Sequence, residues 1–158
     1  MIILGIDPGT AATGYGFIKA SSKRISLVDF GCIKTQAGEE MPKRLFRLRK
    51  ELKKLIKEFR PEMMVIERLF FNTNAKTAMT VGQARGVVML VAAEAKLPVL
   101  EYTALQAKKE LTGYGRADKK EVEKAVKRCL RIRRKIRPDD AADALAIAIC
   151  HVKKCQNV

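Results

Sequence analysis

Four acidic residues stand in apolar segments, where the surrounding sequence predicts that they are buried. They are Asp7, Glu67, Asp140 and Asp143. A buried carboxylate needs a partner, and several buried carboxylates repel one another unless cations neutralise them. Ligand sets made only of oxygen favour hard ions such as Mg²⁺ or Mn²⁺. Together with a basic surface, such a cluster indicates two-metal hydrolysis of phosphodiester bonds.

The first of these acids lies in a predicted β-hairpin. Residues 2–6 form an apolar run typical of a buried strand, and Asp7 ends it. Pro8 and Gly9 then turn the chain toward a second strand over 14–20. A metal ion or a metal-bound nucleotide phosphate would suit the Asp7 carboxylate here. The alternative is that this carboxylate only caps its own loop.

The remaining acids are placed by later elements of the chain, which hydrophobic periodicity and capping residues predict. The predicted elements, in order, are strands over 2–6, 14–20 and 25–34, a helix over 42–59, a strand over 63–67, a helix over 73–95, a strand over 97–102, and helices over 104–111, 119–130 and 138–149. This alternation of strands and helices predicts an α/β domain, and 158 residues suit one domain.

Two spacing arguments separate the acids from ordinary surface carboxylates. Glu67 repeats the arrangement of Asp7, an acid at the C-terminal end of an apolar strand, which is where α/β sheets bind ligands. Asp140 and Asp143 are three residues apart, so they project from one face of the last helix. The helix dipole explains an acid in the first turn, such as Asp139, but not Asp143 one turn further in.

The charge of the chain points to a polyanionic partner. The net charge is +15, from 32 Lys and Arg against 17 Asp and Glu, and most of the positive residues lie in 43–60 and 116–137. Nucleic acid is the first candidate. An anionic membrane is the second, but the chain has no Trp of the kind that membrane-surface helices use. A thermophile's charged surface would enrich Glu as well, so it does not explain the imbalance.

The sequence also predicts a cytoplasmic location. No signal peptide is visible, and no apolar run is long enough to span a bilayer. The four cysteines are scattered, as expected for reduced, structural thiols. Cys150, His151 and Cys155 lie close together, but no second pair of metal ligands accompanies them. His151 is the only histidine and lies near the terminus, so no Ser-His-Asp or Cys-His set competes with the acids.

Four motifs resemble the RuvC family of bacterial Holliday-junction resolvases, in the same order and over nearly the whole chain. They lie at 6–16 (Asp-Pro-Gly with Thr-Gly-Tyr-Gly), 66–70 (Ile-Glu-Arg-Leu-Phe), 82–87 (Gly-Gln-Ala-Arg-Gly-Val) and 140–148 (Asp-Ala-Ala-Asp followed by an apolar run). The resemblance implies a ribonuclease H-like fold, with a five-stranded mixed sheet in the order 3-2-1-4-5 flanked by α-helices. It places a single nuclease domain over 1–153 and a short tail over 154–158.

The resemblance also implies an activity in DNA recombination and repair. A homodimer would nick two strands of like polarity in a four-way DNA junction, using two Mg²⁺ ions per subunit, for which Mn²⁺ can substitute. The branch-migration proteins RuvA and RuvB would be its partners, and no membrane would be involved. The four acids match the family's catalytic and metal-binding positions.

DNA-binding roles follow from the same matching. Phe70 matches an aromatic residue that contacts junction bases, and an exposed Phe70 could stack on an unpaired base. Lys108 and Lys119 match basic residues near the scissile phosphate, and Arg68 lies beside Phe70 on the same predicted loop. The alternative for the loop is that Phe70 and Phe71 both pack into the core.

Three other functions compete with this interpretation. An ATPase of the actin and sugar-kinase type shares the Asp-x-Gly-Thr hairpin, but it needs a second phosphate loop and a much longer, duplicated chain. A non-catalytic nucleic-acid-binding module on the same fold should have lost an acid, and all four are present. A nuclease of the smaller YqgF type has a similar start, but the Phe70 loop and the pair Asp140 and Asp143 favour the RuvC family.

Overall fold

The computed structural model describes residues 1–22, 24–69 and 75–156 of the chain. The elements in these ranges are β1 (Ile2–Asp7), β2 (Ala12–Ala20), β3 (Ile25–Lys34), α1 (Met41–Phe59), β4 (Met63–Arg68), α2 (Ala75–Glu94), β5 (Val99–Thr103), α3 (Ala104–Thr112), α4 (Lys119–Leu130) and α5 (Asp139–Gln156). Their order confirms the predicted alternation. Helix α5 runs on to Gln156, so residues 154–156, which the sequence assigned to a tail, belong to its last turn.

The strands form one mixed sheet in the order β3-β2-β1-β4-β5, as predicted. The first three strands are an antiparallel meander, whereas β4 and β5 run parallel to β1. Ile6 on β1 pairs with Ile66 on β4. The next residues, Asp7 and Glu67, therefore leave two adjacent strands at the same edge of the sheet.

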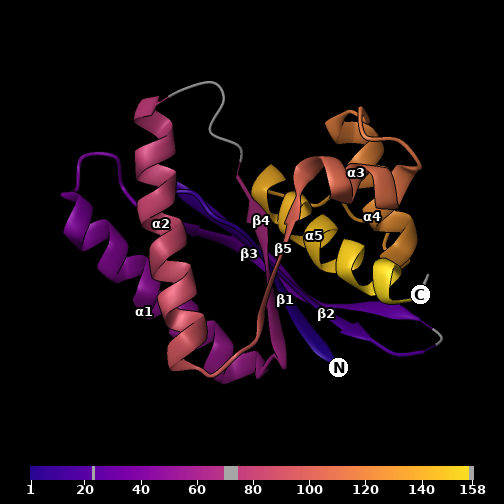
Figure 1. Ribbon diagram of the computed structural model, residues 1–158, viewed down its shortest axis with the longest axis horizontal. Coiled ribbons are helices and arrows are strands. Elements are labelled where there is room, and N and C mark those ends of the chain that lie inside the picture. The colour runs from indigo at the N-terminus through magenta and orange to yellow at the C-terminus, as the bar shows by residue number, and fades with distance from the viewer. Residues whose placement is uncertain (23, 70–74, 157–158) are drawn as a thin grey trace.

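Helices cover both faces of the sheet, with α1 and α2 on one side and α3, α4 and α5 on the other (Figure 1). Successive strand residues point to opposite faces. Ile3 and Val65 therefore pack in the cluster formed with α5, while Leu4 and Ile66 pack in the cluster formed with α1 and α2. Burial on both faces explains why β1 and β4 are almost wholly apolar up to their terminal acids. Among the described residues, no helix combines the length and apolar character needed to cross a membrane.

Small residues let α5 lie unusually close to the sheet. A Cβ atom added at Gly5 would overlap the carbonyl oxygen of Ala144, and one added at Gly14 would overlap that of Asp140. These glycines are needed for close approach, because no side chain fits between strand and helix. The contact fixes the first turn of α5 against β2, beside the end of β1.

Candidate active site

The four acids come from three elements that meet at one end of the sheet. Asp7 ends β1, Glu67 lies near the end of β4, and the other two occupy the first turns of α5, whose start lies beside these strand ends (Figure 1). Asp7 pairs with Gly14 in the β1–β2 register, and Gly14 in turn touches the main chain of Asp140. The hairpin and the helix therefore set the distance between these two acids.

Burial and mutual repulsion make Asp7, Glu67 and Asp143 hard to ionise. Burial, together with the charges of Asp143 and Asp140, raises the pKa of Asp7 to about 7. Burial, together with repulsion from Asp7 and Asp143, raises the pKa of Glu67 to about 8. The pKa of Asp143 is raised chiefly by burial. A shared negative field in a desolvated site is the condition under which cations bind carboxylates.

Two lysines oppose this repulsion from the neighbouring helices. The charges of Lys108 on α3 and Lys119 on α4 lower the pKa values of Glu67 and Asp143, and Lys119 also lowers that of Asp7. Capping boxes fix where these helices begin, at Thr103 for α3 and at Asp118 for α4. The lysines are thus held beside the acids by well-defined helix starts.

The oxygen-only donor set suits a hard divalent cation, although the side chains do not form a closed ligand cage. In the described part of the chain, no three His, Cys, Asp or Glu side chains converge closely enough to hold an ion. The pKa values of Asp7 and Glu67 stay raised, chiefly through burial, even with the charges of the nearby lysines. Carboxylates that repel one another in this way fit Mg²⁺ or Mn²⁺.

A basic groove follows α4 and reaches Asp143, one of the four acids. One section, of about 410 Å³, is lined by Asp143 together with Lys119, Lys120, Lys135 and Arg137. The next section, of about 360 Å³, shares Lys120 and Lys135 with the first and adds three more cations, Lys124, Lys127 and Arg133. Closely spaced lysines and arginines of this kind suit the phosphates of a nucleic-acid backbone.

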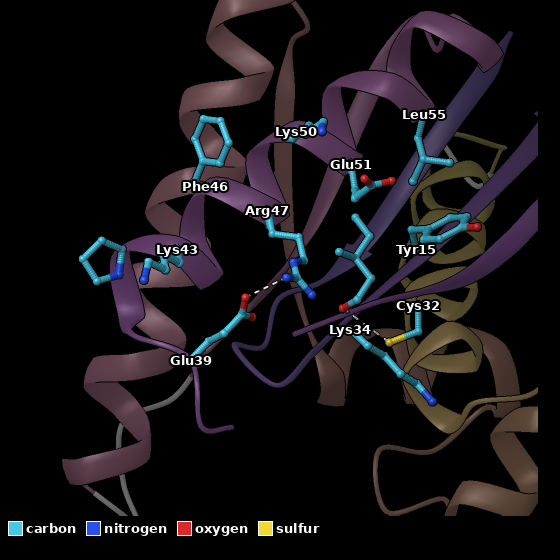
Figure 2. Close-up of a pocket in the computed structure, with 12 residues that line it drawn as sticks. Tyr15, Cys32, Lys34, Glu39, Lys43, Phe46, Arg47, Lys50, Glu51 and Leu55 are labelled. Atoms are coloured by element: carbon cyan, nitrogen blue, oxygen red, sulfur yellow. Dashed lines mark hydrogen bonds and ion pairs between the residues drawn. The ribbon is translucent and has the colours of Figure 1, made fainter. Parts of the chain in front are cut away.

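A second cavity, of about 890 Å³, lies between α1 and the β2–β3 part of the sheet (Figure 2). Its lining includes Phe46, Lys34 and Lys50, and Arg47 spans part of it to pair with Glu39 at 2.6 Å. None of the four acids lines this cavity. This cavity is therefore separate from the cluster of four acids.

The remaining predicted site residues have mixed placements. Arg68 ends β4 directly after Glu67, but its Nε lies 3.9 Å from Glu101 Oε2 instead of facing the acids. Phe70 and Phe71 lie outside the described residues.

The cysteine and histidine pair noted at the C-terminus is a small local cluster. Cys155 Sγ lies 3.7 Å from His151 Nε2, and the Tyr102 hydroxyl lies 3.0 Å from His151 Nδ1. All four cysteines are free thiols. Cys155 and His151 are only two candidate zinc ligands. A zinc site needs more, and no group of three or more such ligands forms among the described residues.

Sequence reasoning missed two contacts that hold the strand ends carrying Asp7 and Glu67. Arg85 on α2 donates a hydrogen bond to the Glu67 carbonyl oxygen at 3.1 Å. The Thr10 hydroxyl, in the loop after Asp7, donates to the Thr80 carbonyl oxygen of the same helix at 2.6 Å. The sequence does show one arginine, Arg85, among the small residues of α2. It does not show which residues Arg85 contacts, because these lie far away along the chain.

The sheet order and the helices on both faces define a ribonuclease H-like protein. A family model described as crossover junction endodeoxyribonuclease RuvC matches residues 3–151. The chain belongs to the RuvC family. Curated relatives carrying that description include one from Syntrophomonas wolfei, 49% identical over 96% of this chain and 88% of the relative, and one from Desulfitobacterium hafniense, 53% identical over 96% and 92%.

Solved structures give the same result. Thermus thermophilus RuvC is 34% identical, covers 99% of this chain and 96% of its own, and superposes with a TM-score of 0.91. The same protein in complex with Holliday junction substrate superposes with a TM-score of 0.93 at the same identity and coverage. The yeast mitochondrial resolvase Ydc2, with a TM-score of 0.73 and 16% identity, shares the fold.

The raised pKa of Asp7 predicts that Asp7→Asn stabilises the metal-free protein at neutral and higher pH. Because the folded state holds the Asp7 proton more tightly than the unfolded state, the stability this provides is full below about pH 4 and is lost as pH rises to about 7. The amide of Asp7→Asn does not ionise, so this variant keeps the free energy of unfolding that wild type loses. The difference is on the order of 2 kcal/mol after discounting for partial solvation. Thermal melts in EDTA at pH 8 should place Asp7→Asn several degrees above wild type, with the gap closing near pH 4.

A matched control for this stability prediction is Glu40→Gln, because Glu40 forms an exposed ion pair with Lys43 at 3.1 Å. Exposed pairs contribute little, so this variant should melt like wild type at both pH values. If Asp7→Asn is no more stable than wild type at pH 8, then burial and the neighbouring acids do not raise the pKa of Asp7 as described above.

Proposed function

We propose that this protein is a Holliday-junction resolvase, which cuts four-way DNA by two symmetric nicks in strands of like polarity during recombination and repair. The observation that carries this proposal is the meeting of the four acids from β1, β4 and α5 beside a basic groove that Asp143 lines. The likeness to Thermus thermophilus RuvC in complex with Holliday junction substrate supports the choice of a branched DNA as the target.

In this proposal the four acids hold two Mg²⁺ ions per subunit, and Mn²⁺ can take their place. When bound, such ions supply a nucleophilic water at neutral pH and stabilise the leaving oxygen. The protein's own part is to fix the carboxylates on two strand ends and one helix. Lys108 and Lys119, whose charges act on the same acids, hold the scissile phosphate against them.

Cleavage of a synthetic four-way junction tests the proposed function, with a linear duplex of the same arm sequence as the control. Each strand is end-labelled in turn, so that the position of every nick is mapped. We expect paired nicks at matching positions in two strands of like polarity, and little cutting of the duplex. Cutting of both substrates alike would instead favour a general nuclease of the YqgF type, and binding without cutting would favour a non-catalytic module.

We further propose that the protein acts as a homodimer, because two symmetric nicks require two active sites. Helix α2 is apolar on both faces. Val88 and Val91 pack against the sheet, whereas Met79 and Leu90 are 71% and 52% exposed. Phe46, on the neighbouring α1, is 63% exposed. We infer that the two subunits meet through these exposed apolar side chains of α2 and α1. RuvA and RuvB as partners and a cytoplasmic location belong to the same proposal.

Leu90→Asp should disrupt the dimer, because it places a charge in the proposed apolar interface. We expect its dimer dissociation constant to rise about tenfold or more, with paired nicking lost in parallel. Leu105→Asp is the matched control, since Leu105 is 60% exposed on α3, away from α2. Sedimentation of both variants measures the effect. Wild type that stays monomeric at micromolar concentration, with and without junction DNA, would contradict the dimer.

Phe70→Ala should slow junction cleavage without unfolding the protein. The expectation rests on the sequence, which places Phe70 three residues after Glu67. Loss of one base-stacking contact should weaken the reaction by about 1–3 kcal/mol, roughly tenfold or more. Phe71→Ala is the control, expected to lower the melting temperature instead. If Phe70→Ala melts early and its folded fraction cuts normally, Phe70 is a core residue.

A further inference from the structure

Arg85 joins helix α2 to the main chain of Glu67. Its Nη1 donates to the Glu67 carbonyl oxygen at 3.1 Å, and its Nη2 pairs with Glu101 Oε1 on β5. The Arg85 side chain is only 17% exposed. A guanidinium held by a carboxylate is a planar, pre-oriented donor, so little freedom remains to be lost when it also binds the carbonyl.

Arg85 approaches Glu67 from the side of the sheet opposite the other acids. Ile66 packs in the cluster that contains Ala84 and Val88 of α2. Side chains alternate along a strand, so the Glu67 carboxylate points to the other face, where it feels the charge of Asp7. Arg85 therefore binds the main chain of Glu67 from the α2 side of the sheet, while the Glu67 carboxylate lies on the α5 side.

The same helix also holds the end of β1. The Thr10 hydroxyl donates to the Thr80 carbonyl oxygen at 2.6 Å, and Thr10 lies three residues after Asp7. Two strand ends that each carry an acid are thus tied to one helix. These ties act where β1 and β4 stop pairing with each other, since the β1–β4 register ends at Ile6 and Ile66, while Asp7 still pairs with β2 and Glu67 with β5.

We propose that Arg85 is a positioning residue for Glu67, and that its contact with the carbonyl oxygen sets where the carboxylate stands among the four acids. This inference rests on the proposed function, in which Glu67 holds metal. Losing Arg85 should leave junction binding intact, since the basic groove beside α4 is untouched. It should weaken metal binding and slow the chemical step together.

The experiment compares Arg85→Met, Arg85→Lys and the control Arg49→Met. Arg49 on α1 also pairs with a glutamate, Glu94 of α2, at 2.6 Å, and that ion pair joins two helices and no strand. We measure kcat at saturating junction, the junction Kd in EDTA, and Mn²⁺ affinity by electron paramagnetic resonance without DNA. Arg85→Met should lower kcat and Mn²⁺ affinity by about tenfold to a hundredfold, with the Kd unchanged.

The other variants separate positioning from stability. Arg85→Lys should recover part of both losses, because an ammonium can still donate one of the two bonds, and Arg49→Met should match wild type throughout. Should Arg85→Met fold poorly, the double variant with Glu101→Leu removes the stranded carboxylate and should show the same losses. Wild-type kcat and Mn²⁺ affinity in folded Arg85→Met or the double variant would overturn the proposal. Failure of wild type to cut junctions would count against the proposed function alone, since the Mn²⁺ measurement needs no DNA.

Discussion

Asp7→Asn is expected to abolish junction cleavage while junction binding survives. The carboxylate is lost from a site where the acids are proposed to hold metal, whereas the lysines and arginines along α4 are proposed to hold DNA. The same result is expected for three other variants, Glu67→Gln, Asp140→Asn and Asp143→Asn. Cleavage in Mg²⁺ and gel-shift binding, measured side by side, check this separation. Ca²⁺ should allow wild type to bind but not cut, because Ca²⁺ prefers looser coordination than Mg²⁺.

Asp139→Asn is the control for the amide series. Asp139 lies in the first turn of α5 like Asp140, but it is exposed and forms an ion pair with Arg137. It should therefore cut junctions as wild type does. An amide variant among the four that keeps near-wild-type cleavage would remove its residue from the active site.

Gly14→Ala is expected to have the second largest effect. The new methyl group would overlap the Asp140 carbonyl oxygen and crowd its Cβ, and neither can yield without moving the start of α5. Displacement of a catalytic group by about 1 Å can lower a rate roughly a hundredfold. Overpacking should also lower the free energy of unfolding by about 1–3 kcal/mol. Cleavage rates at a temperature where the variant is fully folded, together with thermal melts, check both effects.

Gly38→Ala is the matched control, because a Cβ atom at Gly38 meets nothing within 4 Å. This variant should match wild type in both measurements. If Gly14→Ala cuts junctions at the wild-type rate, α5 does not depend on Gly14 for its place against β2.

Much of the fold could be predicted from the sequence, because local signals agree with the final structure. Thr103 and Asp118 are typical N-cap residues, and their side chains cap the first turns of α3 and α4. The leucines of α1 form one stripe, and Leu48 and Leu52 from it are buried. Boundaries were less predictable. β2 begins at Ala12, two residues before the predicted start, because sheet pairing continues past the turn: Ala12 pairs with Lys34.

The candidate site was predictable only in part. The sequence shows which acids stand in apolar segments, and the structure places all four at one end of the sheet. It does not show that Gly14 spaces α5 from β2, since that contact joins residues more than a hundred positions apart. The contact of Arg85 with the Glu67 carbonyl oxygen could not be predicted either. Every residue has a backbone carbonyl, so the sequence does not show which one accepts a hydrogen bond.

Binding of Mn²⁺ tests most directly whether these four acids form one metal centre. Electron paramagnetic resonance counts free Mn²⁺ as it is titrated into wild type, the four amide variants and Asp139→Asn, without DNA and at a pH above the raised pKa values of Asp7 and Glu67. We predict saturable binding by wild type and Asp139→Asn, and marked weakening in each of the four amide variants. Equal Mn²⁺ binding by wild type and all four variants would contradict a shared metal centre.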